Sequence, residues 1–563
     1  MTFALKFALT TAACAALAGA PAFAVPADLR EKAEAELARS WPADGPGVAA
    51  IVTEGGEAVF AGGRGLADVE ARTPVTPQTV FRLGSITKQF TAAVIMQLVA
   101  EGRLSLDDPL SRFLPDYPQP GAGATVRQLL NHTSGVQSYT GIPGWMVEAN
   151  TNRAYTTEEL IAVFRALPSP SQPGERWAYN NSGYVLLGAI IERVTNMPWH
   201  RAVEERIATP LRLRTIRGGT GEGEMPLMAR GYTAGPDGVR PAMLIHMSVP
   251  HAAGALIGSV EDLARWAQAL HHGEVVDAAG YARMIAPTPM PSGDSAPYGF
   301  GLRLGEVRGR RAIEHAGGIF GGSTESVYLP DQNLFVAVFA NSDSPAGSPG
   351  LTARRLAALA LGDPYPTFEL ATLDMAAVEP FLGVYTLPDG AGERRFFARD
   401  GKLFTQRSGG NELEAFAAGD GRYFYGAQSL TWFRLERDAA GAMAMLMYQN
   451  GEPEAERTLR AGPIPPEAAA VAVARETLAT YAGRYASPIG PVTIALADNG
   501  GLTIQVEGQP AFAMRATSST EFAVGAVSAR VVFHSEAGRI TRLVIHQGGR
   551  ELPATKEAAP PGS

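Results

Sequence analysis

The feature that most limits how this chain can fold is an internal repeat in its C-terminal third. Residues 381–388 (FLGVYTLP) match residues 481–488 (YAGRYASP), and Gln449-Asn450-Gly451 matches Gln547-Gly548-Gly549 at nearly the same offset. Between these anchors, short β-prone runs alternate with turns roughly every 8–12 residues, a spacing typical of small antiparallel barrels or sandwiches. The repeat predicts two homologous β-barrel modules, at 375–461 and 475–555, whose simplest role is to pack on the domain that precedes them.

The first 365 residues carry a different pattern. Helical sequences at 28–39 and 351–361 enclose strand-like runs at 48–52, 58–63, 325–329 and 334–340. A chain of 563 residues also exceeds what one hydrophobic core supports. Residues 25–365 are therefore predicted to form one α/β (α+β) domain. In it, helices flank an antiparallel sheet that is closed by segments far apart in the sequence.

The extreme N-terminus has the pattern of a secretory signal peptide. A positive charge at Lys6 precedes the apolar residues 7–20, and Ala22-Phe23-Ala24 places small residues at a cleavage site after Ala24. The apolar stretch is shorter than the roughly 20 residues that a membrane span needs. We therefore expect residues 1–24 to be removed and the protein to be exported, to the periplasm or beyond, without a membrane anchor.

Composition excludes several kinds of chemistry. The only cysteine, Cys14, lies within the signal, so the mature chain has no thiol for catalysis, disulfides or zinc. A formal net charge of −8 with no basic run argues against nucleic acid as a partner. The nine histidines show no H-x-x-x-H spacing, and no glycine-rich phosphate loop is apparent. We expect no metal or cofactor, and a small molecule or short peptide as substrate; the oligomeric state stays open.

Ser85-Ile86-Thr87-Lys88 is the first motif that carries chemistry. We expect Ser85 to cap a helix that ends near Gly102, so the serine hydroxyl and the lysine amine share a helix face. Serine needs a neighbouring base, and a lysine shielded from water can have its pKa lowered enough to act as one. Taken alone, the same residues also fit a helix cap beside a surface lysine.

Two further motifs follow in order. Tyr179-Asn180-Asn181 offers a phenol that can relay protons, if cationic neighbours depress its pKa, and an amide that can bond both lysine and substrate. His315-Ala316-Gly317-Gly318 offers a histidine that can polarise the site and glycines that let a substrate backbone approach. Individually, the first is also a helix-capping turn and the second an ordinary strand end.

Together these motifs resemble the signature of the serine β-lactamase/penicillin-binding-protein superfamily: S-x-x-K, then Y-x-N, then [KH]-[TSAG]-G. Residues 129–135 (LLNHTSG), 253–256 and 262–264 resemble phrases of its class C-like branch. The resemblance implies that Ser85 is acylated, that Lys88 and Tyr179 share the acid–base work, and that Asn181 orients the substrate. It also implies an oxyanion hole made by the N–H groups of Ser85 and Gly318, and a structural role for His132.

The resemblance fixes acyl-transfer chemistry more firmly than the substrate. A histidine at 315, where many β-lactamases carry lysine, favours a peptidase or an esterase. The two trailing modules resemble the layout of bacterial D-aminopeptidases, in which a barrel loop reaches the active site; residues 406–412 are the candidate loop here. We prefer a peptidase or amidase for D-amino-acid or other short peptides. A carboxylesterase, a β-lactamase or penicillin-binding protein, and a non-catalytic binder of cell-wall fragments stay open.

Overall fold

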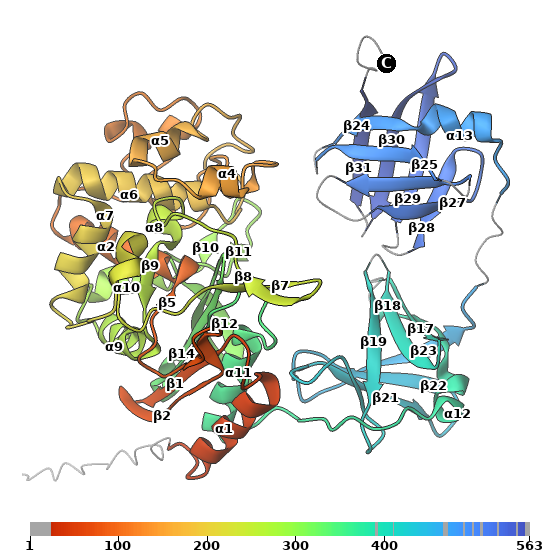
Figure 1. Ribbon diagram of the computed structural model, residues 1–563, viewed down its shortest axis with the longest axis horizontal. Helices are drawn as coiled ribbons and strands as arrows, with labels where there is room; N and C mark the ends of the chain where they lie inside the picture. The colour runs from red at the N-terminus through yellow and green to blue at the C-terminus, as the bar shows by residue number, and fades with distance from the viewer. Residues whose placement is uncertain are drawn as a thin grey trace, which may run out of the picture.

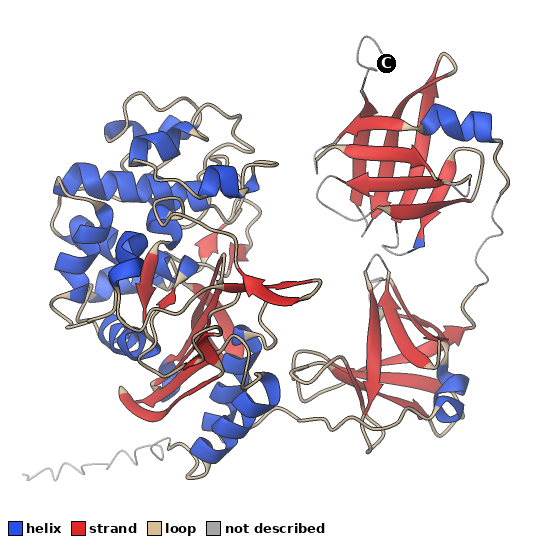
Figure 2. Cartoon of the chain, in the orientation of Figure 1, coloured by secondary structure: helices blue, strands red, loops and turns tan. Residues whose placement is uncertain are grey.

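The computed structural model describes residues 24–388, 392–408, 410–465, 471–487, 490–497, 500–506, 511–525, 529–547 and 550–557. The predicted signal peptide lies outside these ranges except for Ala24, and so do the repeat residues Pro488, Gly548 and Gly549. Figure 1 shows an N-terminal domain of helices and sheet followed by two β-barrels, and Figure 2 shows that nearly all helix belongs to the first domain.

A six-stranded antiparallel sheet forms the centre of the first domain. Its strand order is β12-β13-β14-β15-β1-β2. These strands are β12 (Arg303–Val307), β13 (Arg310–Ile319), β14 (Gly322–Leu329), β15 (Leu334–Ala340), β1 (Val48–Glu54) and β2 (Glu57–Arg64). Strand β1 pairs with β15 along its whole length. The predicted fold class is therefore confirmed, because the two ends of the domain meet in the middle of one sheet.

Helices cover both faces of this sheet. Successive residues of β1 alternate between two cores: Val48, Ala50 and Val52 pack on one side, and Ala49 and Ile51 on the other. The first side contacts α1 (Leu29–Ser40) and α11 (Pro349–Ala360), and the second contacts α9 (Val260–His271). Four more helices pack together in the core on the α9 side of the sheet: α2 (Thr87–Ala100), α6 (Asn181–Thr195), α7 (Trp199–Val203) and α8 (His251–Gly254). Because the other helices surround α2, most of its residues are buried.

Shorter elements complete the helical part of the domain. They are α3 (Val126–Leu130), α4 (Glu148–Thr151), α5 (Thr157–Ala162) and α10 (Ala278–Met284), together with the small strands β5 (Phe81–Arg82) and β9 (Leu256–Gly258). Strand β5 pairs with β9 directly before the Ser85 segment. Among the described residues, no helix is both long and apolar enough to cross a membrane.

Each repeat module is a closed antiparallel barrel of eight strands, as predicted. Barrel one runs from β16 (Gly383–Thr386) to β23 (Glu456–Gly462), and barrel two from β24 (Gly483–Ala486) to β31 (Arg550–Lys556). The repeated Gly-x-Tyr has a structural cause. Tyr385 donates to the Phe381 carbonyl as Tyr485 does to that of Tyr481, and Gly383 and Gly483 have φ of 150° and 143°.

Barrel one packs on the first domain through α11. The buried guanidinium of Arg355 donates to the carbonyls of Gln428 and Ser429, and the Gln428 amide donates to Thr352. These contacts agree with the packing role expected for this module. The candidate loop at 406–412, of which residue 409 lies outside the described residues, bonds within its own barrel through Gln406 and Glu412.

Candidate active site

Ser85 lies in a tight turn between β5 and α2. The turn is a 3-10 segment, Gly84–Ile86, and the N-cap position of α2 is Ile86, which makes no side-chain capping bond. The prediction that Ser85 caps the helix is therefore wrong. Gly84 has a φ of 54°, and a Cβ there would lie 3.0 Å from the Gly318 nitrogen. The turn thus needs glycine to bring the Ser85 backbone against β13, and the Ser85 hydroxyl is left available for other contacts.

Lys88 is completely buried next to this serine. Its Nζ lies 3.0 Å from Ser85 Oγ, 2.8 Å from Asn181 Oδ1 and 2.8 Å from the Ala253 carbonyl oxygen. Within the described residues, Lys88 forms no ion pair with a carboxylate. Burial without a compensating charge moves the pKa of Lys88 well below its ordinary value. The amine is therefore suited to accept a proton from Ser85 at neutral pH.

Tyr179 and Asn181 approach from the start of α6. The Ser85 hydroxyl lies close enough to the Tyr179 phenol to affect its pKa, and the Lys88 amine lies 4.8 Å from the centroid of the Tyr179 ring. Asn181 Nδ2 donates to Thr140 Oγ1 at 3.0 Å, which turns its carbonyl oxygen toward Lys88. The three motif residues that the sequence predicts to act with Ser85 therefore meet around one hydroxyl.

The environment of Tyr179 differs from the one expected. The residue as a whole is 37% exposed, but its hydroxyl end is enclosed beside Ser85. Burial raises the pKa of Tyr179, and the hydrogen bond from Ser85 and the charge of Arg303 offset this only in part. The condition under which Tyr179 would relay protons as a base, a pKa depressed by cations, is therefore not met, because burial outweighs the charge of Arg303. A phenol that keeps its proton can donate a hydrogen bond or a proton but is a poor base.

The His132 ring packs against the Tyr179 ring. Its ring is buried with its centroid 4.4 Å from that of Tyr179, and its Nδ1 accepts the Asn180 N–H at 3.1 Å. Burial, followed by the charge of Lys88, lowers the pKa of His132 well below its ordinary range. The imidazole is therefore neutral and serves to hold the Tyr-Asn-Asn segment in place, which agrees with the structural role inferred from the sequence.

His315 and Gly317 lie behind the site. His315 is buried, with Nε2 2.9 Å from the Tyr298 hydroxyl and Nδ1 2.7 Å from the Ala316 carbonyl oxygen. Burial and the charge of Lys88 lower the pKa of His315 to about 3, so it is neutral. A Cβ on Gly317 would meet the Leu83 carbonyl oxygen at 2.1 Å. This glycine therefore gives room to the segment before Ser85 and not to a substrate.

Gly318 faces open space. A Cβ at this position would meet no atom within 4 Å, and the residue lines a cavity of about 360 Å³ together with Ser85 and Asn181. The rest of the wall is mainly apolar, from Tyr139, Met146, Ile245, Pro250, Ile319 and Phe320. Sequence reasoning missed the Ala253 carbonyl, Thr140, Tyr298 and Asp343. Only Ala253 had a signal, since it begins one of the class C-like phrases.

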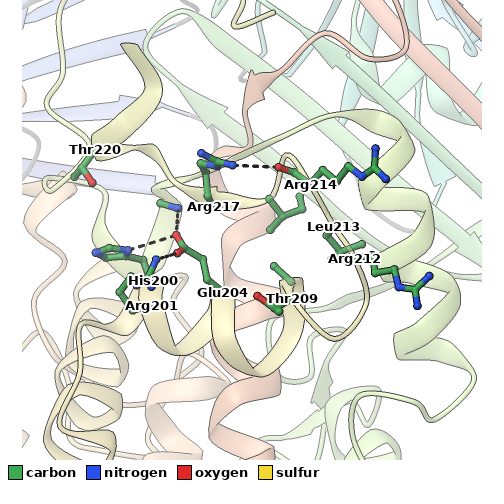
Figure 3. A pocket seen from close by; sticks show the side chains of 12 residues that line it. His200, Arg201, Glu204, Thr209, Arg212, Leu213, Arg214, Arg217 and Thr220 are labelled. Carbon is green, nitrogen blue, oxygen red and sulfur yellow. Dashed lines mark hydrogen bonds and ion pairs between the residues drawn. The ribbon is translucent and has the colours of Figure 1, made fainter. Parts of the chain in front are cut away.

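A second hollow, of about 550 Å³, lies near α7 and is drawn in Figure 3. Glu204 sits within it and bonds Arg201 and the Gly218 N–H. No serine, cysteine or lysine is among the described residues that line this hollow, so it offers no activated nucleophile. In the part of the chain that the structure describes, no three His, Cys, Asp or Glu side chains gather as a metal site requires.

The profile of the family described as Beta-lactamase matches residues 35–361, more than half of the chain. The chain belongs to the β-lactamase family. This confirms the resemblance drawn from the three motifs, and the family with its relatives makes the chain a serine hydrolase.

Named relatives of this β-lactamase-family chain include peptidases. Penicillin-binding protein 4* of Bacillus subtilis (strain 168) is 26% identical over 432 residues, covering 72% of this chain and 94% of that protein. D-aminopeptidase of Gluconobacter oxydans (strain 621H) is 28% identical over 341 residues, covering 60% of this chain and 62% of that protein. The match to the D-aminopeptidase thus spans less than two thirds of that relative.

Two solved structures share the fold. The octameric penicillin-binding protein homologue from Pyrococcus abyssi has a TM-score of 0.54 at 27% identity, covering 76% of this chain and 99% of its own. The D-amino acid amidase from Ochrobactrum anthropi SV3, complexed with D-phenylalanine, has a TM-score of 0.53 at 26% identity, covering 59% of this chain and 99% of its own.

Proposed function

We propose that this protein is an exported amidase or peptidase that cleaves short peptides, D-amino-acid peptides in particular, through an acyl-enzyme on Ser85. One observation carries the proposal. A fully buried lysine with no carboxylate partner among the described residues lies 3.0 Å from the serine hydroxyl, at the edge of an open cavity. An unpaired buried amine is costly for folding alone, which points to a catalytic use.

In the acylation step, neutral Lys88 takes the proton of Ser85 while Oγ attacks the substrate carbonyl. The C–O bond to Ser85 forms, the carbonyl oxygen becomes negative, and Lys88 becomes an ammonium whose three N–H groups point to Ser85, Asn181 and Ala253. The Ser85 N–H is one of the free donors at the start of a helical turn, and the Gly318 N–H faces it from β13. These two groups stabilise the oxyanion.

Collapse of this intermediate expels the amine. Tyr179 keeps its proton because burial raises its pKa, so it donates to the leaving nitrogen and is reprotonated by the Lys88 ammonium beside its ring. The C–N bond breaks, and the acyl group remains on Ser85. Water then releases the acid with Lys88 as the base again. His315 contributes no charge to either step, because it is neutral and bonded to Tyr298.

Relatives and wall chemistry support the choice of substrate. D-aminopeptidase and D-amino acid amidase are among the similar proteins, and a mainly apolar cavity fits a hydrophobic amino-acid side chain. Export is supported by the signal-like residues 1–24 and by the absence of cysteine from the rest of the chain.

Intact-mass spectrometry after treatment with a fluorophosphonate tests the nucleophile. We expect one adduct, mapped to Ser85, that is absent from Ser85→Ala and retained by Ser323→Ala, since Ser323 also lines the cavity but contacts no lysine. A panel of D-amino-acid amides, simple esters and a penicillin then tests the substrate. Amide turnover supports the proposal; turnover of esters alone, a lasting penicillin adduct, or rapid penicillin hydrolysis would replace it with the corresponding activity. Folded protein that reacts with none of these reagents would leave a binding role.

A further inference from the structure

The cavity lies beside Ser85 toward the end of β13. Its lining includes Gly318 and Ile319 of β13 and Phe320 just after it, but neither Tyr179 nor His315. Because Tyr179 protonates the leaving nitrogen in the proposed reaction, the leaving group lies on the Tyr179 side. The cavity on the opposite side therefore receives the acyl half of the substrate, the part that precedes the scissile bond.

This part of β13 has an open edge. Strand β12 pairs with β13 only from Arg310 to Glu314, and the residues that follow pair with β14 on the other side alone. A Cβ on Gly318 would meet no atom within 4 Å, and the Gly84–Ser85 turn lies against the nitrogen of this residue. An extended peptide can therefore lie along residues 316–319 as an added strand, with its carbonyl at the Gly318 N–H and its amino end running toward Phe320.

Asp343 stands where such a peptide would end. It is the one charged residue among the described residues that line the cavity, and it is exposed. Its Oδ2 accepts the Gly321 N–H at 2.8 Å, and its Oδ1 accepts from the Ser344 hydroxyl at 3.3 Å. These bonds hold the carboxylate at the β13–β14 turn and leave about two of its four acceptor sites for a ligand. Among the described residues, Asp343 forms no ion pair.

The distance along β13 selects the length of the acyl group. Gly321, whose N–H the Asp343 carboxylate accepts, lies in the turn that follows β13, three residues beyond Gly318 and less than the about 10 Å that three extended residues span. An ammonium on the residue that bears the scissile carbonyl stays within about 3 Å of that carbonyl. The amino end of a two-residue acyl group extends about 7 Å and reaches the carboxylate.

Resting on the proposed function, we infer that Asp343 binds the terminal ammonium of a dipeptidyl acyl group, so that the enzyme releases dipeptides from the amino end of its substrates. The apolar wall then holds the side chain of the residue that bears the scissile carbonyl. Acyl groups that end in a carboxylate are disfavoured, because they would place a negative charge against Asp343. Arg82 donates to the Phe320 carbonyl at this end of the cavity and has a further partner.

A matched pair of substrates tests this assignment in the full-length mature protein. The pair is glycyl-D-phenylalanine p-nitroanilide and its N-acetyl derivative, which differ only in the terminal charge. We expect kcat/KM to favour the free amine by about two- to fivefold, the usual scale for one exposed charge pair. In Asp343→Asn, which keeps an oxygen for the Gly321 N–H, the preference should vanish, so that the two substrates have equal kcat/KM values. Asp331→Asn, at an exposed carboxylate paired with Arg311, is the control and should keep the preference.

The outcomes separate the two proposals. Equal rates on both substrates, or a preference that survives in Asp343→Asn, would overturn the role of Asp343 while Ser85-dependent cleavage still supports the proposed function. D-Phenylalanine p-nitroanilide should be insensitive to Asp343→Asn, and a selective loss on this short substrate would overturn the two-residue reach. Failure to cleave any p-nitroanilide, with Ser85 still labelled by fluorophosphonate, would overturn the dipeptidyl substrate; failure of labelling as well would overturn the proposed function itself.

Discussion

Replacing Asn181 with aspartate puts a negative charge where Lys88 now contacts an amide oxygen. The two side chains have nearly the same shape, and an acidic residue in the first turn of α6 is favourable for the helix. The Thr140 hydroxyl, which now accepts from Asn181, can rotate to donate to the new carboxylate. We therefore expect Asn181→Asp to fold normally and to change chiefly the proton affinity of Lys88.

The size of the effect follows from the contact distance. At an effective dielectric constant of about 20, a unit charge 2.8 Å from Lys88 Nζ stabilises the ammonium by about 6 kcal/mol. Desolvation of the new carboxylate offsets part of this. A remainder of only about 2 kcal/mol would raise the pH at half-maximal activity by about 1.5 units. Because the base must be neutral, the variant should be nearly inactive at neutral pH and regain activity in alkaline solution.

The rate of fluorophosphonate labelling of Ser85, measured by mass spectrometry across pH, checks this without relying on substrate binding. Asn181→Ala is the matched control, since it removes the same contact without adding a charge and should not move the midpoint upward. A midpoint in Asn181→Asp within half a unit of the parent value, on folded protein, would contradict the assignment of Lys88 as the titrating base.

Three further variants test other parts of the structure. Gly317→Ala should destabilise the fold by more than about 3 kcal/mol, because its Cβ would meet the Leu83 carbonyl oxygen at 2.1 Å, whereas Gly318→Ala should unfold like the parent in urea; equal stabilities would contradict this packing. Burial, then Glu314, raises the pKa of Glu325 from 4.5 to about 8, so its stabilising contribution is full below 4.5 and is lost as pH rises through about 8. Glu325→Gln should therefore give a flatter melting temperature from about pH 5 to 9, and a slope like that of the parent would refute the raised pKa of Glu325. Arg355→Met should loosen barrel one and speed proteolysis at residues 363–366, while an unchanged cleavage rate would show that other contacts hold the barrel.

Local patterns in the sequence were enough to predict the β-lactamase-family domain, the two barrels and the residues gathered at Ser85. The S-x-x-K spacing places two side chains on one helical face, and the repeated Gly-x-Tyr reports a bond within each barrel. Such patterns can be recognised in a sequence because they join residues only a few positions apart. That segments far apart in the sequence close one domain could also be expected, since helices and strands recur at both of its ends, and the pairing of β1 with β15 agrees with this.

Tertiary packing alone decided how these residues are used. Ser85 looked like a helix cap, but the chain turns at Gly84 to meet β13, and its hydroxyl faces Lys88 instead. The pKa of Lys88 depends on burial by segments more than 90 residues away, including Asn181 and Ala253. His315 is turned toward Tyr298, and Asp343 reaches the cavity only because β15 ends beside the β13–β14 turn. Burial and long-range contact are properties of the folded chain, and no spacing within one segment encodes them.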